Sequence, residues 1–167
     1  YAAWDITKGS KNVIVSIHDQ GVDVDHEDLK DAMWVNEAEL NGVTGVDDDG
    51  NGYKDDIYGF NFAANMGTVE AMYHGTHVAG TVGAVNNNGT GVSGVAGGSG
   101  SNDGVRIMTC QILGGTGWGN TPDSYVYAAD MGSLISQNSW GYSEPYSYEQ
   151  VVLDAIDYFI AEAGSYA

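Results

Sequence analysis

The segment His74-Gly-Thr-His-Val-Ala-Gly-Thr81 says most about how this chain folds. A histidine opens a run of small residues, among them Gly75, Ala79 and Gly80. Small side chains would let a helix press closely against a sheet. We therefore expect His74 at the start of a helix that carries its imidazole towards the ends of neighbouring strands. A metal-binding pair of His74 and His77 is the alternative, although the segment lacks the glutamate of a metalloprotease helix.

Three short apolar runs on either side of this segment predict strands of a parallel sheet. They cover residues 12–18, 105–113 and 134–138, and segments that favour helices separate them. Such alternation is typical of a parallel sheet. We expect an α/β fold of three layers, with a mainly parallel sheet and helices on both faces.

Capping signals mark two further helices. Ser147 and Gln150 fit a capping box, and Gly164 lies where a left-handed C-terminal cap is expected. Thr121-Pro122 predicts another helix, with threonine as the cap and proline in the first turn. The helix after Ser147 should bury one face, made of Val151, Val152, Ala155, Ile156, Phe159, Ile160 and Ala163.

The composition limits the classes of partner. The chain has 23 acidic and 5 basic side chains, and its formal charge is −18. This charge would repel nucleic acids and anionic membrane surfaces. No segment has the apolar length of a membrane span. We therefore expect neither nucleic acid nor a membrane span.

Much of the negative charge lies in Asp47-Asp-Asp-Gly-Asn-Gly-Tyr-Lys-Asp-Asp56. Oxygen donors at positions one, three and five, then a glycine and a backbone carbonyl, are typical of a calcium loop. Tyr58 replaces the glutamate of an EF-hand, and a solvated acidic turn is the alternative. The predicted ligands are Asp47, Asp49, Asn51, the carbonyl of Tyr53, and one or both of Asp55 and Asp56.

Asp19 ends the first predicted strand, where open α/β sheets place their working residues. By itself an Asp-x-Gly sequence is more often only a turn. Together with His74, however, Asp19 would supply two members of a Ser, His and Asp triad, in the order Asp, His, Ser.

Four ordered motifs resemble the subtilisin-like serine protease family. They are Ile17-His-Asp-Gln-Gly-Val-Asp23 with His26-Glu-Asp-Leu29, the His74 segment, Gly89-Thr-Gly-Val-Ser-Gly-Val-Ala96, and Asn138-Ser-Trp-Gly141. The resemblance implies that residues 1–167 are the amino-terminal part of one subtilisin-like domain. Such a domain is a secreted or cell-surface endopeptidase that hydrolyses peptide bonds through an acyl-enzyme. Asp19 would orient the imidazole, and His74 would be the general base and then the general acid.

This sequence departs from the family pattern in several places. The Gly-Thr-Ser-Met-Ala nucleophile motif and the oxyanion asparagine have no counterpart here, so we expect both further along and this chain alone to be inactive. Ser93 is the serine whose neighbours are most similar to the nucleophile motif, and we interpret it as structural. His18 stands where the family usually has a small or apolar residue. Gln20 stands where the family usually has Thr or Ser. The resemblance implies that His77 packs inside the helix–sheet interface.

The resemblance also implies a peptide substrate and a second calcium site. An extended peptide would add as a strand between two walls, Gly117-Trp118-Gly119 and Ser139-Trp140-Gly141. A core role for either tryptophan is the alternative. Asp28 and Asn87 would contribute side chains to the second calcium site, and a plain Asn- and Gly-rich turn is the alternative there.

Two other functions stay open at this point. A non-catalytic, calcium-dependent peptide-binding module could keep the fold after losing the chemistry, as His18 and Gln20 hint. A flavodoxin-like nucleotide domain fits the alternation, but Asp23 and Asp25 would repel phosphate after the first strand. Residues 134–138 would form an exposed apolar edge, which needs a partner. We therefore expect the remaining carboxy-terminal part of the domain to pair with this chain.

Overall fold

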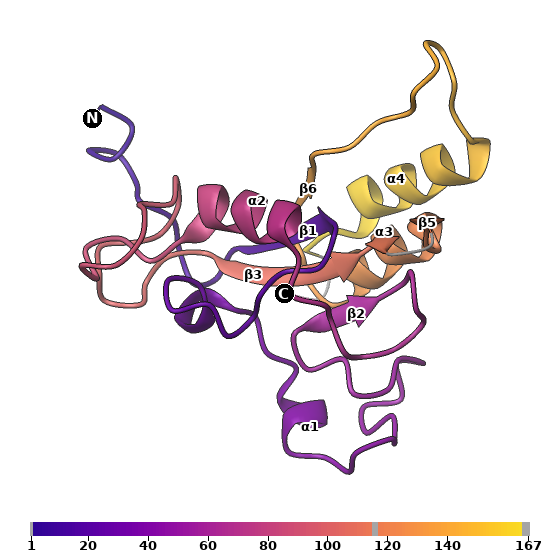
Figure 1. Ribbon diagram of the computed structural model, residues 1–167, viewed down its shortest axis with the longest axis horizontal. Helices are drawn as coiled ribbons and strands as arrows, with labels where there is room; N and C mark the ends of the chain where they lie inside the picture. Colours follow the sequence, from indigo (N-terminus) through magenta and orange to yellow (C-terminus); the bar gives the residue numbers. More distant parts are fainter. Residues whose placement is uncertain (1, 115–116, 165–167) are drawn as a thin grey trace.

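Four parallel strands form the main sheet of this chain. The computed structural model describes every residue except 1, 115–116 and 165–167. Its sheet has the spatial order β2 (Gly59–Asn61), β3 (Arg106–Gln111), β1 (Ile14–Asp19) and β6 (Ile135–Asn138) (Figure 1). β1 pairs along its whole length with β3, from Ile14↔Arg106 to Asp19↔Gln111. The three predicted strands are therefore present, and the first of them is central.

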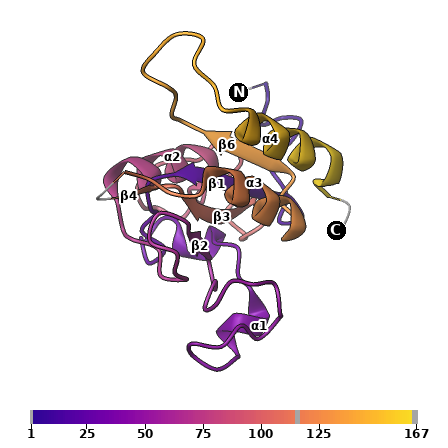
Figure 2. The ribbon, with the colours of Figure 1, turned by 90° about the vertical axis from the view of Figure 1, so that its right-hand side faces the viewer.

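Helices cover both faces of the sheet (Figures 1 and 2). α2 (Tyr73–Gly83) lies on one face, where Ala79 packs with Val15 and Ile107. α3 (Thr121–Asp130) and α4 (Gln150–Glu162) lie on the other face, where Met108 and Phe159 belong to a second apolar cluster. Because helices cover both faces of this parallel sheet, its central strands β1 and β3 are almost completely buried. The expected three-layer α/β fold is confirmed.

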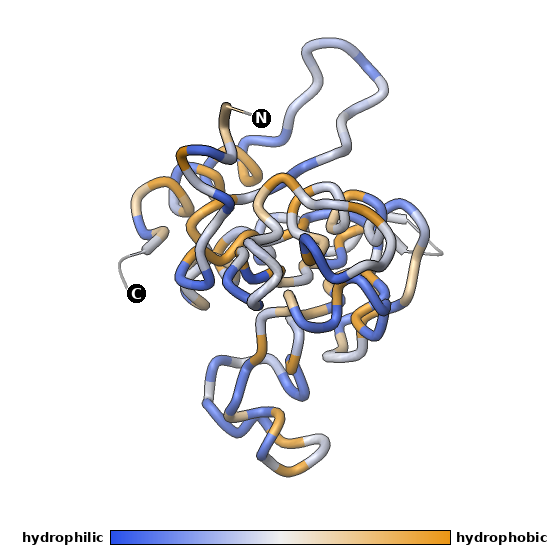
Figure 3. Tube along the Cα trace, turned by 90° about the vertical axis from the view of Figure 1, so that its left-hand side faces the viewer, coloured by the Kyte–Doolittle hydropathy of each residue, from blue (hydrophilic) through white to orange (hydrophobic). Residues whose placement is uncertain are grey.

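The remaining elements are short and lie outside the main sheet. β4 (Leu113–Gly114) and β5 (Gly117–Trp118) form a two-stranded antiparallel ribbon. The 3-10 helix Lys30–Ala32 and α1 (Glu37–Leu40) come between β1 and β2. α1 and the acidic loop after it project from the body of the molecule, with long hydrophilic stretches (Figures 1 and 3).

Two of the three predicted helix caps are wrong. Asn120 caps α3, because its side chain accepts from the Asp123 backbone N–H, and Thr121 is already helical. α4 begins at Gln150 with no side-chain cap, because Ser147 instead belongs to a turn closed onto Glu144. Gly164, at φ +80°, is left-handed as predicted.

Part of the predicted apolar face of α4 is exposed. Val152, Ala155 and Phe159 are buried, but Val151 is 54% and Ile160 72% exposed. β6 lies at the edge of the sheet, and Ile135 in it is 50% exposed. The expected exposed edge is therefore present in the described part of the chain. None of the helices described here is both long and apolar enough to cross a membrane.

Candidate active site

Asp19 and His74 touch at the carboxyl end of β1. Nδ1 of His74 lies 2.6 Å from Oδ1 of Asp19. Asp19 is fully buried, whereas the side chain of His74 is 45% exposed. An ionised carboxylate only accepts hydrogen bonds, so Nδ1 is the donor, and in the neutral imidazole Nε2 then keeps its lone pair. This orientation leaves Nε2 able to take a proton from a reacting group.

Two glycines bring the start of α2 against the end of β1. A Cβ at Gly75 would lie 2.3 Å from the carbonyl oxygen of Gln20, and one at Gly21 would lie 1.8 Å from that of Glu70. Such distances exclude every side chain, so only glycine permits this close approach. The backbone packing between these two elements therefore sets the distance between Asp19 and His74.

The carboxylate of Asp19 has one satisfied and one unsatisfied oxygen. The backbone N–H of Gln20 donates to Oδ1 at 2.6 Å. Every residue type except proline supplies that N–H, so the departure at Gln20 does not remove this bond. Oδ2 has no hydrogen-bond partner among the described residues. A buried oxygen without a donor costs about 1–3 kcal/mol.

His18 precedes Asp19 but faces the opposite side of the sheet. Its Nδ1 lies 2.9 Å from the hydroxyl of Ser124, and its Nε2 lies 3.0 Å from that of Ser16. The ring stacks on Tyr125, with a centroid separation of 4.5 Å. Burial lowers the pKa of His18 from 6.5 to about 3. His18 is therefore a neutral part of the α3 interface and takes no part in the Asp19–His74 pair.

The predicted position of His77 is wrong. The face of α2 that meets the sheet holds Gly75, Ala79 and Gly83, which are spaced four residues apart. His77 lies on the exposed face, near the ring of Tyr73, and lines a cavity of about 660 Å³. Helical periodicity explains the difference, because a residue midway between two inward positions points outward.

The two predicted substrate walls lie side by side. Gly117 and Trp118 form β5, and the backbone N–H of Gly119 donates to Ile112 at 2.7 Å. Ser139, Trp140 and Gly141 follow directly after β6. The ring centroids of Trp118 and Trp140 are 5.0 Å apart. Trp118 is 53% exposed, and Trp140 is half-buried at the margin of the α3–α4 core.

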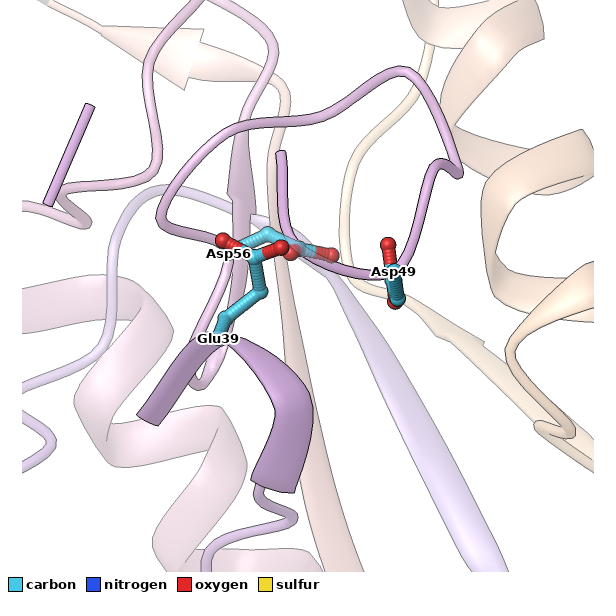
Figure 4. Close-up of side chains that lie close together, drawn as sticks. All are labelled: Glu39, Asp49 and Asp56. Atoms are coloured by element: carbon cyan, nitrogen blue, oxygen red, sulfur yellow. The ribbon is translucent and has the colours of Figure 1, made fainter. Parts of the chain in front are cut away.

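Three acidic side chains converge beside the projecting loop (Figure 4). Glu39, Asp49 and Asp56 offer oxygens that all lie within 4.8 Å of one another. Glu39 and Asp56 are buried. Burial raises the pKa of Asp56, hydrogen bonds from Tyr127 and Asn51 oppose the shift, and the charges of Asp49 and Glu39 add to it. A divalent cation would relieve this repulsion.

Two other predicted carboxylate ligands of this loop bind backbone groups outside the cluster. The carboxylate of Asp47 accepts backbone N–H groups of residues 50–52, and that of Asp55 accepts the N–H of Gly45. At Tyr53 the predicted ligand is the backbone carbonyl, and the ring packs against Phe60 and Tyr127. Of the side-chain ligands predicted here, the structure brings together Asp49, Asn51 and Asp56.

The sequence reasoning missed Glu39 and Asn36. Asn36 caps α1 and donates to Asp49 at 2.9 Å and to Asp56 at 3.2 Å. Glu39 accepts the backbone N–H groups of Asp48 and Asp55. The available signal was an asparagine followed three residues later by a glutamate, just before an acidic loop.

Asp28 also sits in a cation-compatible setting. It is 2% exposed and accepts from the side chain of Asn88 and from the backbone N–H of Val92. Asn87, the predicted second ligand, instead donates to the carbonyl of Ser99. The same loop holds Asn86, whose buried carboxamide oxygen has no partner in the described structure. An unpaired buried oxygen is suited to a calcium ligand.

Comparison with known proteins identifies the family. The chain matches the subtilase family over residues 10–166. It belongs to that family. Its similarity therefore covers almost all of the chain, including the Asp19 and His74 motifs.

Individual subtilases show how much of a relative this chain spans. Subtilisin-like protease 1 of Plasmodium vivax is 45% identical over 100 residues, which are 59% of this chain and 15% of that protein. The halolysin-like extracellular serine protease Nep of Natrialba magadii is 32% identical over 142 residues, 83% of this chain and 22% of Nep. Fervidolysin from Fervidobacterium pennivorans, a keratinolytic enzyme related to subtilisin, matches with a TM-score of 0.65 at 26% identity, covering 96% of this chain and 21% of that one. The chain spans less than a quarter of each.

Proposed function

We propose that this chain is the amino-terminal part of a subtilisin-like serine endopeptidase domain that hydrolyses peptide bonds through an acyl-enzyme. The 2.6 Å contact between Asp19 and His74 carries this proposal. It joins a buried acid to a half-exposed imidazole within a chain of the subtilase family. The nucleophilic serine and the oxyanion asparagine lie outside these residues.

The geometry suits the proton transfers of acyl transfer. Nε2 of His74 takes the proton of the serine hydroxyl as the hydroxyl attacks the peptide carbonyl, and then gives it to the departing amine. Asp19 stays ionised, holds the imidazole by Nδ1 and stabilises the imidazolium between those steps. A water molecule then uses the same base to release the acyl group.

Substitutions in the complete domain test the assignment of Asp19 and His74. His74→Ala and Asp19→Asn should each lower kcat for a chromogenic peptide by about three to six orders of magnitude. His77→Ala removes the same side chain from another face of α2, outside the Asp19–His74 pair, and is the matched control. Thermal melting should show all three variants folded. A folded His74→Ala domain with near wild-type kcat would contradict the proposed mechanism.

The remaining part of the domain is the proposed partner of this chain, together with the peptide substrate. Three apolar surfaces support this: the edge of β6, Val151 and Ile160 on α4, and the outer side of α2. On that outer side, Tyr73 is 84% and Val95 67% exposed, and both line the cavity beside His77. Soluble proteins rarely leave such surfaces uncovered.

Calcium is the proposed ion for the acidic loop and for the Asp28 loop. Hard oxygen ligands on flexible loops favour calcium over transition metals. Glu39, Asp49 and Asp56 would supply carboxylates to the first ion, and Asp47, Asn51, Tyr53 and Asp55 could join after local rearrangement. Asp28 with Asn86 or Asn87 would serve the second. A secreted or cell-surface location agrees with calcium dependence and with the extracellular relative Nep.

A further inference from the structure

The carboxamide oxygen of Asn138 accepts two hydrogen bonds from different parts of the fold. The hydroxyl of Tyr125 donates to it at 2.7 Å, and the indole N–H of Trp140 donates at 3.1 Å. A carbonyl oxygen has two lone pairs and can serve both donors. The amide nitrogen of Asn138 donates to the hydroxyl of Ser136 at 2.9 Å. Asn138 thus links α3, through Tyr125, to the wall that follows β6.

The side chain of Tyr125 is held in place by the core of the protein. It is 3% exposed, and its ring stacks on His18 of the central strand. Burial, with smaller contributions from neighbouring groups, raises the pKa of Tyr125 to about 12. The hydroxyl therefore stays protonated and remains a donor across the neutral range. Asn138 also pairs in register with His18 across the sheet.

The ring of Trp140 contacts the other wall, Gly117-Trp118-Gly119. This ring lies edge-on to Trp118 at 5.0 Å and to Tyr142 at 6.1 Å, and Trp118 stacks on Tyr142 at 6.3 Å. We name these three side chains the aromatic cluster. Trp118 is 53% and Tyr142 39% exposed, so the cluster presents apolar surface outside the core.

The backbone beside the aromatic cluster is open. A Cβ at Gly117 or at Gly141 would meet no atom within 4 Å. A peptide backbone could therefore approach both glycines while one of its side chains rests on the aromatic rings. An apolar or aromatic side chain would gain most there, because edge-to-face contacts add to the burial of apolar area.

We propose that Asn138 is a positioning residue for substrate specificity: it holds Trp140 against Trp118, and the aromatic cluster receives an apolar side chain of the substrate peptide. This rests on the proposed function, in which the two walls bind an extended peptide. Tyr125 acts through Asn138 and touches no substrate. The predicted selectivity is for one large apolar residue at a fixed place in the peptide.

Binding to an inactive domain tests this proposal. His74→Ala in the complete domain prevents cleavage during a titration, and calorimetry gives the Kd of alanine-based peptides that carry one phenylalanine at successive positions. One position should bind about tenfold more tightly than the all-alanine peptide. Adding Trp118→Ala should abolish that gain. Adding Tyr125→Phe or Asn138→Leu should reduce it several-fold.

Two further variants separate positioning from general stability. Asn138→Asp keeps an acceptor oxygen and should retain most of the gain. Tyr158→Phe is the matched control, because it removes a tyrosine hydroxyl that donates to Asp130 on α3 and not to Asn138. Its Kd values should equal those of the His74→Ala parent.

Each other outcome overturns a stated part of the proposal. No preferred phenylalanine position, or tighter binding when lysine replaces phenylalanine there, overturns the apolar subsite. A preference that needs Trp118 but survives Tyr125→Phe and Asn138→Leu overturns the positioning role. Because binding is measured, failure of the wild-type domain to hydrolyse peptides would count against the proposed function alone.

Discussion

At the scale of single residues, His18 and Asp19 show how neighbouring residues of β1 contact opposite faces of the sheet. Successive side chains of a strand point to opposite sides. Asp19 therefore faces the start of α2, while His18 faces α3 and joins the hydroxyls of Ser16 and Ser124. Full burial makes the protonated form of His18 costly.

This burial predicts a loss of stability at low pH. The pKa of His18 falls from 6.5 when unfolded to about 3 when folded. As the pH drops below 6.5, the unfolded chain takes up the proton first, so the free energy of unfolding decreases. Between pH 7.5 and 4.5, His18 alone should lower the free energy of unfolding by about 2–3 kcal/mol.

Denaturant titrations of the complete domain at these two pH values measure the effect. His18→Gln should remove that share of the pH dependence. Ser124→Ala also weakens the buried network but keeps the imidazole, so it should lower stability and preserve the wild-type pH dependence. Equal pH dependence in wild type and His18→Gln would show that His18 is not protonated preferentially in the unfolded chain.

At the scale of elements, α1 and the acidic loop depend on each other. The carboxylate of Glu39 accepts backbone N–H groups from two turns of the loop. The side-chain amide of Asn36 donates to both Asp49 and Asp56. Four residues cannot form a stable isolated helix. The carboxylate cluster, with its proposed ion, is therefore what holds α1 in place.

Calcium should accordingly stabilise the complete domain. At a free concentration of one hundred times Kd, one site adds about 2.7 kcal/mol, which corresponds to a rise in Tm of roughly 5–10 °C. Glu39→Gln and Asp56→Asn should each remove most of the rise caused by this site. Asp157→Asn changes an exposed carboxylate of α4 and should keep it. Melting curves that do not respond to calcium or chelator would identify the loop as a solvated turn.

At the scale of the whole molecule, the sheet ends on an uncovered edge strand, β6, whose first residue and the residue before it are apolar and exposed. β6 pairs with β1 on one side, and Leu134 and Ile135 are 39% and 50% exposed. Residues 139–149 run out from the end of this strand before the chain returns in α4 (Figure 1). An exposed edge of this kind promotes association between chains.

We expect residues 1–167 expressed alone to associate, and the complete domain to be monomeric. Sedimentation velocity measures both states. Ile135→Lys should shift residues 1–167 towards monomer, because an edge lysine opposes strand pairing. Ile6→Lys changes an isoleucine that is 87% exposed and lies outside β6, so it controls for added charge. A monomeric wild-type fragment with a cooperative melting transition would support a self-sufficient binding module.

The amino-acid sequence by itself determined the elements whose signals are local. Short apolar runs located β1, β3 and β6, and Gly164 marked the end of α4. The positions of Asp19 and His74 followed from a strand end and a helix start. Such features depend on residues a few positions apart, and that range is what sequence patterns report.

Only the tertiary structure decided which distant groups meet. Glu39 completes a carboxylate cluster with the loop, Asn88 rather than Asn87 reaches Asp28, and His77 faces away from the sheet. Each outcome depends on how two separate segments pack, and a shift of one residue on a helix or loop turns a side chain to another face. Local pattern therefore determines where Asp19 and His74 lie in the fold, and long-range packing determines their surroundings.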